Sequence, residues 1–187
     1  MSEELIQRNL VEAPEKMGDW NFYNIGATTL KALKNAKIIP NRDYAEFEGK
    51  KPDALIVKKP LVIAAIEYKT PQELRTKTQI AKAIAQELGT ARALQARVYI
   101  VTDGKKSFWV NPSTGNEILQ EDGSKVTLNF DKNSTECIAL ISKIRSSINA
   151  RNDQLWQREF GKIYGQYLGQ HQRIVYIHLS KFSYSNT

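Results

Sequence analysis

Three charged residues in the first half of the chain have the types and the spacing that metal-dependent hydrolysis requires. Asp53 follows a proline, and Glu67 and Lys69 stand two residues apart at the end of an apolar run. Side chains of a strand alternate between its two faces, so Glu67 and Lys69 are expected to point the same way, with Tyr68 opposite. The pattern predicts two carboxylates and one ammonium group at one end of a sheet.

An antiparallel hairpin would bring the two carboxylates together. Residues 53–69 can fold back at Lys58 to Pro60, and Asp53 and Glu67 are equally distant in sequence from Pro60. Directly opposed residues of an antiparallel pair have Cβ atoms about 4.5–5.5 Å apart. Two carboxylates at that distance repel each other unless a cation lies between them. We therefore expect Asp53 to lie opposite Glu67.

A hard divalent cation is the expected occupant of this position. Mg²⁺ takes oxygen ligands, usually one or two carboxylates together with water and substrate phosphate. The sequence predicts Mg²⁺, with Mn²⁺ as a substitute, bound by Asp53, Glu67 and the backbone carbonyl of Tyr68. Lys69 would orient an attacking water and stabilise charge that develops on a phosphate. The simpler alternative is a structural α/β domain in which Glu67 and Lys69 form only a salt bridge.

The hydrophobic pattern places these residues on strands between helices. Strands are predicted over 53–57 and 61–69, and a helix over 72–94 follows at once, with Gly89 as a point of interruption. The other predicted elements are helices over 2–12 and 21–37, a short strand at Tyr44 and Phe47, strands over 97–102 and 107–110, edge strands over 116–119 and 125–129, and a helix that Ser134 caps and that runs to about Ala150. This order predicts an α/β fold with a mixed central β-sheet flanked by helices.

Length and composition fit one domain with a short extension. The chain has 187 residues, and we expect a domain over 1–150 and a C-terminal extension over 151–187. Cys137 is the single cysteine and is predicted to be a small buried apolar residue. The acidic amino terminus and the lack of a long apolar run predict a cytoplasmic protein with no membrane segment.

The chain is basic, with a net charge of +7, and residues 21–100 hold twice as many Lys and Arg as Asp and Glu. Such an excess attracts phosphate backbones through counterion release, which makes DNA the expected partner. A lysine-rich solubilising surface is the alternative. Much of the excess comes from Lys31, Lys34, Lys37, Lys50, Lys51, Lys58 and Lys59.

Three segments resemble the PD-(D/E)xK nuclease superfamily. They are 51–57 (KPDALIV), 66–71 (IEYKTP) and 98–104 (VYIVTDG). More narrowly, they resemble the N-terminal nuclease domain of type I restriction enzyme R subunits and nuclease domains fused to adenine methyltransferases. The resemblance implies a restriction-endonuclease-like core and a Mg²⁺-dependent DNA endonuclease of restriction type that hydrolyses phosphodiester bonds. It also implies that Asp53 and Glu67 bind the metal and that Lys69 serves the attacking water.

The resemblance implies a further catalytic residue on the helix after the second strand. Such domains often carry a Gln-x-x-x-Tyr pattern there, and Gln86 is our choice for the glutamine, with Gln79 as the second choice. Thr90 stands where the pattern has tyrosine, so this part is incomplete. Many members also have an acidic residue on the helix before the first strand, and the helix predicted over 21–37 contains none.

In larger members of the family the nuclease domain is joined to other parts. The resemblance therefore implies methyltransferase, specificity or motor subunits as partners, although neither motor nor methyltransferase motifs occur in the sequence. Double-strand cleavage would need two copies of one active site, which makes a homodimer an expectation. A catalytically inactive DNA-binding or interaction module that keeps the nuclease fold remains the alternative function.

Overall fold

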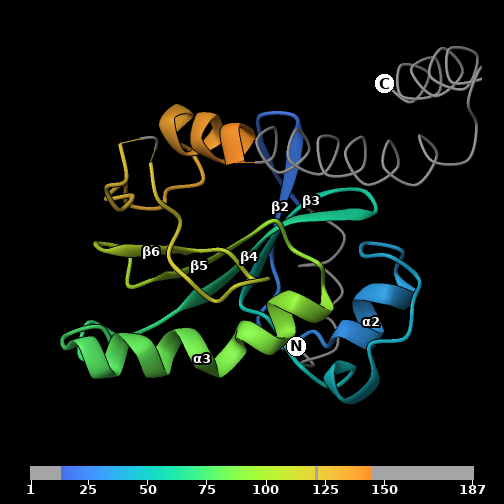
Figure 1. The fold of residues 1–187 in the computed structure, drawn as a ribbon. Coiled ribbons are helices and arrows are strands. Elements are labelled where there is room, and N and C mark those ends of the chain that lie inside the picture. Colours follow the sequence, from blue (N-terminus) through green and yellow to red (C-terminus); the bar gives the residue numbers. More distant parts are fainter. Residues whose placement is uncertain (1–13, 121, 145–187) are drawn as a thin grey trace, which may run out of the picture. The chain divides into compact units, whose positions relative to one another are not determined.

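The computed structural model describes residues 14–120 and 122–144, and six strands and several helices lie in this part (Figure 1). The strands are β1 (Glu15–Met17), β2 (Trp20–Asn24), β3 (Ala54–Lys58), β4 (Leu61–Tyr68), β5 (Val98–Thr102) and β6 (Ser107–Val110). The helices are α2 (Leu30–Asn35), the 3₁₀ helix η1 (Ala45–Phe47) and α3 (Lys77–Ala93), and residues 135–144 are also helical.

The six strands form one mixed sheet in the order β1-β2-β3-β4-β5-β6. All neighbouring strands are antiparallel except β4 and β5, which are parallel. The parallel pair requires a crossover connection, because the chain must return to the end of the sheet where β4 began before β5 can run in the same direction. Helix α3 supplies that crossover. The expected α/β class with a mixed sheet is therefore confirmed.

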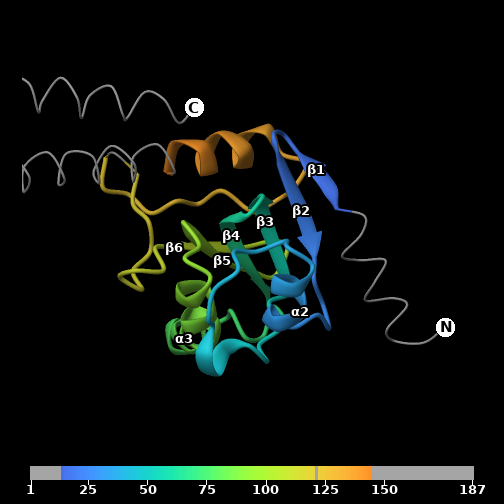
Figure 2. The ribbon, with the colours of Figure 1, turned by 90° about the vertical axis from the view of Figure 1, so that its right-hand side faces the viewer.

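Each face of the sheet is covered by helix (Figures 1 and 2). On one face Leu55, Ala65 and Val101 join a buried core with α2 and α3. Alternate residues of the same strands point to the other face, where buried side chains meet the helix over 135–144. The side chains buried there are Phe22, Ile56, Ile66, Ile100 and Trp109 of the strands, Phe130, and Cys137 and Ile141 of the helix itself. The prediction that Cys137 is buried is confirmed.

Helix α3 begins later than predicted, at Lys77 rather than at residue 72. Thr76 caps it, and a capping box satisfies the backbone N–H groups of Thr76 and Gln79. Just before it, Glu73 accepts hydrogen bonds from the backbone N–H and the hydroxyl of Thr70, which holds the chain in a turn. The helix continues through Gly89 without interruption.

The helix predicted over 21–37 is wrong. Residues Trp20–Asn24 form β2, which pairs with β3, and only Leu30–Asn35 is helical. Phe22 and Tyr23 are both buried, on opposite faces of the sheet, as a central strand requires. Gly26 then adopts a positive φ of 54°, which turns the chain away from the strand. A hydrogen bond from Ala32 N to the Thr29 hydroxyl caps α2.

Two smaller predictions need correction, and a third is confirmed. The strand expected at Tyr44 and Phe47 is the 3₁₀ helix η1. The edge strands expected over 116–119 and 125–129 are reduced to isolated bridges, Val110↔Glu117 and Leu119↔Lys125. The predicted cap at Ser134 is confirmed, because its hydroxyl accepts from the backbone N–H of Cys137 at 3.3 Å.

Some predictions concern residues outside the described part. The helix over 2–12, the end of the last helix near Ala150 and the extension over 151–187 all lie there, and they stay predictions, as does the division into these two domains. Among the helices that are described, none combines the length and apolarity needed to cross a bilayer.

Candidate active site

The β3–β4 hairpin places Asp53 and Glu67 as neighbours at its open end. The strands pair from Lys58↔Leu61 at the turn to Ala54↔Ile66 at the open end, and Asp53 and Glu67 are the next two residues along. A register shift between Ile56 and Val57 moves the pairing by one residue. The turn is thus centred between Lys59 and Pro60, yet the open half of the hairpin has the predicted register around Pro60.

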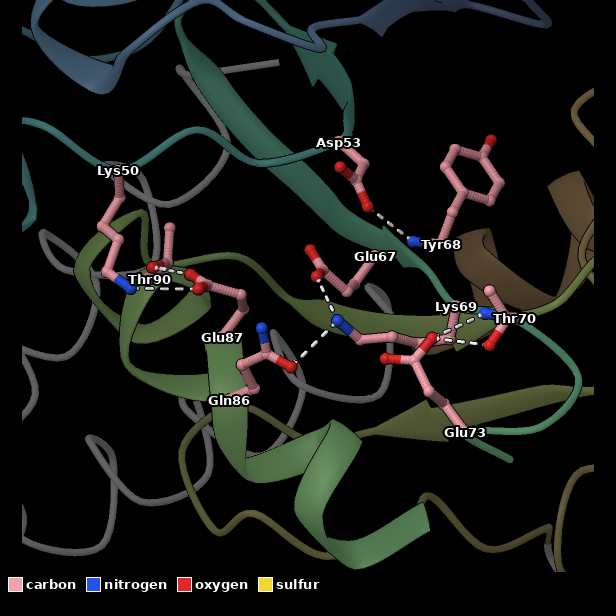
Figure 3. Close-up of polar contacts among 10 residues, drawn as sticks. All are labelled: Lys50, Asp53, Glu67, Tyr68, Lys69, Thr70, Glu73, Gln86, Glu87 and Thr90. Carbon is pink, nitrogen blue, oxygen red and sulfur yellow. Dashed lines mark hydrogen bonds and ion pairs between the residues drawn. The ribbon is translucent and has the colours of Figure 1, made fainter. Parts of the chain in front are cut away.

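Asp53 is fixed in place by hydrogen bonds from two sides, of which Figure 3 draws the one from Tyr68. Its side-chain Oδ2 accepts from the backbone N–H of Tyr68 at 2.7 Å. Its backbone carbonyl accepts from the N–H groups of Ile25 at 2.8 Å and Gly26 at 3.3 Å. These bonds tie Asp53 to β4 on one side and to the end of β2 on the other, so the carboxylate has little freedom to move.

Lys69 connects Glu67 to helix α3. Its ammonium donates to Glu67 Oε1 at 2.8 Å and to Gln86 Oε1 at 3.0 Å (Figure 3). The side chains of Lys69 and Glu67 are only 7% and 10% exposed, so this ion pair is screened little by water. Tyr68 points to the other side of β4, as predicted, and its ring is partly exposed.

The environment of Glu67 opposes its charge. Burial raises the pKa of Glu67, the hydrogen bond from Lys69 lowers it, and the nearby negative charge of Asp53 raises it again, with a net result above the ordinary value. Desolvation and a like charge both disfavour an ionised carboxylate. A cation next to Glu67 and Asp53 would remove both of these penalties.

Each of the two carboxylates keeps one oxygen without a protein partner. Within residues 14–120 and 122–144, the hydrogen bonds to Asp53 use Oδ2 and those to Glu67 use Oε1. Oδ1 and Oε2 remain as ligand atoms from two adjacent side chains. In the same part of the chain no group of three or more His, Cys, Asp or Glu side chains gathers around one point. The described residues therefore offer two carboxylates and no third.

Gln86 lies at the site and Gln79 does not. Gln86 contacts Lys69, whereas the Gln79 side chain accepts from the backbone N–H of Thr76 at 3.0 Å in the capping box. Thr90, which stands where the family pattern has tyrosine, is buried and donates to Glu87 Oε2 at 2.6 Å. The structure thus brings Asp53, Glu67, Lys69 and Gln86 together, while their chemical roles stay predictions.

A second ion pair, not anticipated from the sequence, supports the site. Lys50 Nζ lies 3.0 Å from Glu87 Oε1 and joins the segment before Asp53 to α3 (Figure 3). The two residues are 37 positions apart, and nothing in the local pattern of either one signals the contact. Lys34 is likewise paired, with Glu48. Two of the seven lysines that suggested a DNA surface are therefore neutralised by neighbouring acids.

Other lysines differ in how close they lie to the site. Lys58 and Lys59, which we call the tip lysines, are exposed at the closed end of the hairpin. Lys105 and Lys106, which we call the edge lysines, are exposed in the β5–β6 turn. Because β4 and β5 are parallel, that turn lies at the same edge of the sheet as Lys69.

Comparison with family models, with curated proteins and with solved structures finds no match to this chain. The geometry of the site is therefore the basis for its proposed chemistry.

Proposed function

We propose that the protein is a Mg²⁺-dependent DNA endonuclease with a restriction-endonuclease-like core. The observation that carries the proposal is the convergence of Asp53, Glu67 and Lys69 at the open end of the β3–β4 hairpin. Two carboxylates and an ammonium group in one place are the set of groups that phosphodiester hydrolysis uses. The resemblance of the same residues to PD-(D/E)xK nucleases supports this choice of reaction.

The donor set fits Mg²⁺. Asp53 and Glu67 each offer one carboxylate oxygen that has no partner among the described residues, and Mg²⁺ is commonly held by one or two carboxylates with water in its remaining positions. The backbone carbonyl of Tyr68 would be the third protein ligand, and Mn²⁺ has the same preference for oxygen. When bound, the metal would supply a more acidic water and positive charge beside the phosphate.

The side chains divide the remaining tasks. Lys69 has three N–H donors and uses two of them, for Glu67 and Gln86. The third can hold a water in line with a phosphate. Gln86 fixes the direction of the Lys69 ammonium from the helix side. Asp53 is held by the N–H of Tyr68, so the ligand geometry is set before substrate arrives, which lowers the entropic cost of the reaction.

The charge around the site supports a nucleic acid as substrate. The edge lysines are exposed at the same edge of the sheet as Lys69. Arg75 and Lys77 are exposed between β4 and the first turn of α3. Positive side chains on either side of the hydrolytic centre would hold the phosphate backbone of one strand across it.

A plasmid-nicking assay tests the proposal. Wild-type protein incubated with supercoiled DNA is expected to nick it with Mg²⁺ or Mn²⁺ and not with EDTA. Glu67→Gln and Lys69→Met are each expected to reduce the rate at least a hundredfold, because removing one charged group at such a centre typically costs that much. Glu117→Gln, which alters an ion pair with Lys125, is the control and should nick normally. Nicking that persists in both site variants would reject the assignment.

The alternative is a DNA-binding or interaction module that keeps the nuclease fold without catalysis. It is favoured by one observation: the described residues gather only two carboxylates at the site. Under this alternative the wild type binds DNA in a salt-dependent manner, does not nick it with any divalent cation, and binds equally well after Glu67→Gln. The endonuclease proposal also includes partners: methyltransferase, specificity or motor subunits, and a second copy of the chain. Association measurements on the full chain test them.

A further inference from the structure

One buried hydroxyl next to the candidate active site has no hydrogen-bond partner. Tyr99 lies in β5 with 1% of its surface exposed, and its hydroxyl oxygen is buried without a partner in the described part of the chain. A buried phenol normally finds a partner, because an unsatisfied O–H loses its bonds to water without replacement. An O–H left in this state is available to form a bond in another state of the protein.

The register of the sheet places Tyr99 beside Glu67. Tyr99 pairs with Ala65, and Glu67 pairs with Val101 on the same two strands. Residues two apart on a strand share a face, so Tyr99 and Glu67 are diagonal neighbours on the face that α3 covers. Burial raises the pKa of Tyr99 first, and the negative charges of Glu67, Glu87 and Asp53 raise it further. The charged groups that act on the phenol are thus carboxylates, with Glu67 foremost among them.

The hydrogen bonds of Glu67 suggest when Tyr99 would be used. Glu67 is satisfied through Oε1 by Lys69, and its Oε2 has no partner among the described residues. The Lys69 side chain is only 7% exposed and is held toward the protein by Glu67 and Gln86. If Lys69 turns outward to reach a phosphate, Glu67 loses the one hydrogen bond that the described residues give its side chain, in a place that water hardly reaches.

We propose that Tyr99 is a positioning residue whose hydroxyl donates a hydrogen bond to the Glu67 carboxylate when Lys69 turns toward a substrate phosphate. This inference rests on the proposed function and adds one step to it: Lys69, which holds the water from its resting position, turns from Glu67 toward the phosphate as charge develops there. The hydroxyl keeps the Glu67 carboxylate correctly oriented during that step. In the resting state the same hydroxyl is unsatisfied. Its hydrogen bond therefore stabilises only the state in which Lys69 has turned toward the phosphate.

A double-mutant cycle on the purified full-length chain tests the hydrogen bond without any need for activity. Urea unfolding is measured for wild type, Tyr99→Phe, Lys69→Met and the double variant, all at the same pH. Tyr99→Phe alone is expected to leave the midpoint unchanged or to raise it. In the Lys69→Met background, Tyr99→Phe is expected to increase the unfolding equilibrium constant about tenfold, the usual effect of a hydrogen bond to a charged group. Lys69→Ala is the second background if Lys69→Met does not fold.

A matched control is available in Tyr44. Its hydroxyl donates to the carbonyl of Pro40 at 2.9 Å, away from Glu67. Tyr44→Phe should therefore destabilise the protein equally in the wild-type and Lys69→Met backgrounds, since the two sites are independent. An equal effect of Tyr99→Phe in the two backgrounds would overturn the inference.

Cleavage gives the second readout. If the wild type nicks DNA, Tyr99→Phe is expected to lower kcat about tenfold or more and to leave KM nearly unchanged, because the hydroxyl acts only after substrate has bound. Loss of activity without coupling in the unfolding cycle would assign Tyr99 a different role. A wild type that does not nick DNA rejects the proposed function, and the unfolding cycle then still decides whether Tyr99 pairs with Glu67.

Discussion

Replacing Asp53 in two ways separates its structural bond from its predicted role as a metal ligand. Asp53→Asn keeps an oxygen that can accept from the Tyr68 N–H, which donates to Oδ2 at 2.7 Å in the wild type, but it removes the charge. Asp53→Ala removes both. A hydrogen bond to a charged group contributes about 1.5–3 kcal/mol, and Asp53 is only half-buried, so Asp53→Ala should cost about 1.5 kcal/mol.

The asparagine variant should be close to neutral in the absence of divalent ions. A neutral hydrogen bond is worth about 1 kcal/mol, slightly less than the charged one. That loss is offset because the negative charge of Asp53, which raises the pKa of Glu67, is gone. The charge is lost in Asp53→Ala as well, which reduces the cost of that variant by the same amount. The two variants should therefore differ by the neutral hydrogen bond alone, about 1 kcal/mol in the free energy of unfolding.

Magnesium then reveals the ligand role. A ligand that binds only the folded state at 100 times its Kd adds about 2.7 kcal/mol of stability. The assay is urea unfolding with Mg²⁺ and with EDTA for wild type, both Asp53 variants and Asp43→Ala. In the last variant a comparable carboxylate, which accepts from Ala45 N at 2.8 Å, is lost away from the site. Wild type and Asp43→Ala should gain stability with Mg²⁺, and both Asp53 variants should not. An equal gain in Asp53→Asn would refute the assignment of Asp53 as a ligand.

Three further predictions follow from single contacts. Changing both edge lysines to Glu should weaken DNA binding and flatten its dependence on salt, as measured by fluorescence anisotropy, whereas the same change at the tip lysines should have a smaller effect. Gly89→Ala should lower the free energy of unfolding by about 1 kcal/mol, because its Cβ would lie 2.8 Å from the ring of Phe47 and overpacking outweighs the gain in helix propensity; a urea titration measures it. Burial raises the pKa of Asp103, but hydrogen bonds from the N–H groups of the edge lysines lower it more, so Asp103→Asn should destabilise at neutral pH and have no effect once the pH falls below that lowered pKa.

The hairpin and its open end were predictable because the signal is local. An apolar run, a Lys-Lys-Pro turn and a second apolar run specify the pairing within 17 residues, and side-chain alternation then orients Glu67 and Lys69. The register shift at Ile56 and Val57 was not visible in the sequence. It did not affect the site, because it lies on the turn side of the paired carboxylates.

The strand β2 was missed because its pattern is ambiguous and its partner is distant. Ile25, Leu30 and Leu33 lie at helical spacing, so residues 21–37 fit one helix. In the structure Asn24 pairs with Ala54, 30 positions later, and that long-range pairing outweighs the local preference. The strand that pairs with the outer side of the hairpin is therefore β2, which precedes α2 in the sequence, and not the strand predicted after α2 at Tyr44 and Phe47. The same difficulty hid the Lys50–Glu87 pair and the position of Tyr99 beside Glu67.

The charge balance of the site favours the proposed metal site over a purely structural salt bridge. Asp53 and Glu67 carry two negative charges against the one positive charge of Lys69, and the nearby Lys50 is already paired with Glu87. A salt bridge that serves only stability gains nothing from a second carboxylate, because the extra charge raises the pKa of Glu67 and disfavours its ionised form.

A divalent cation would reverse that imbalance, so the two interpretations predict opposite results at one residue. If the site binds Mg²⁺, Asp53→Asn leaves stability in EDTA nearly unchanged and loses the Mg²⁺-dependent gain. If Glu67 and Lys69 are only a salt bridge, wild type shows no response to Mg²⁺, and Asp53→Asn is as stable as the wild type or more so under both conditions. Unfolding of these two proteins in Mg²⁺ and in EDTA therefore decides between them even if no DNA is ever cleaved.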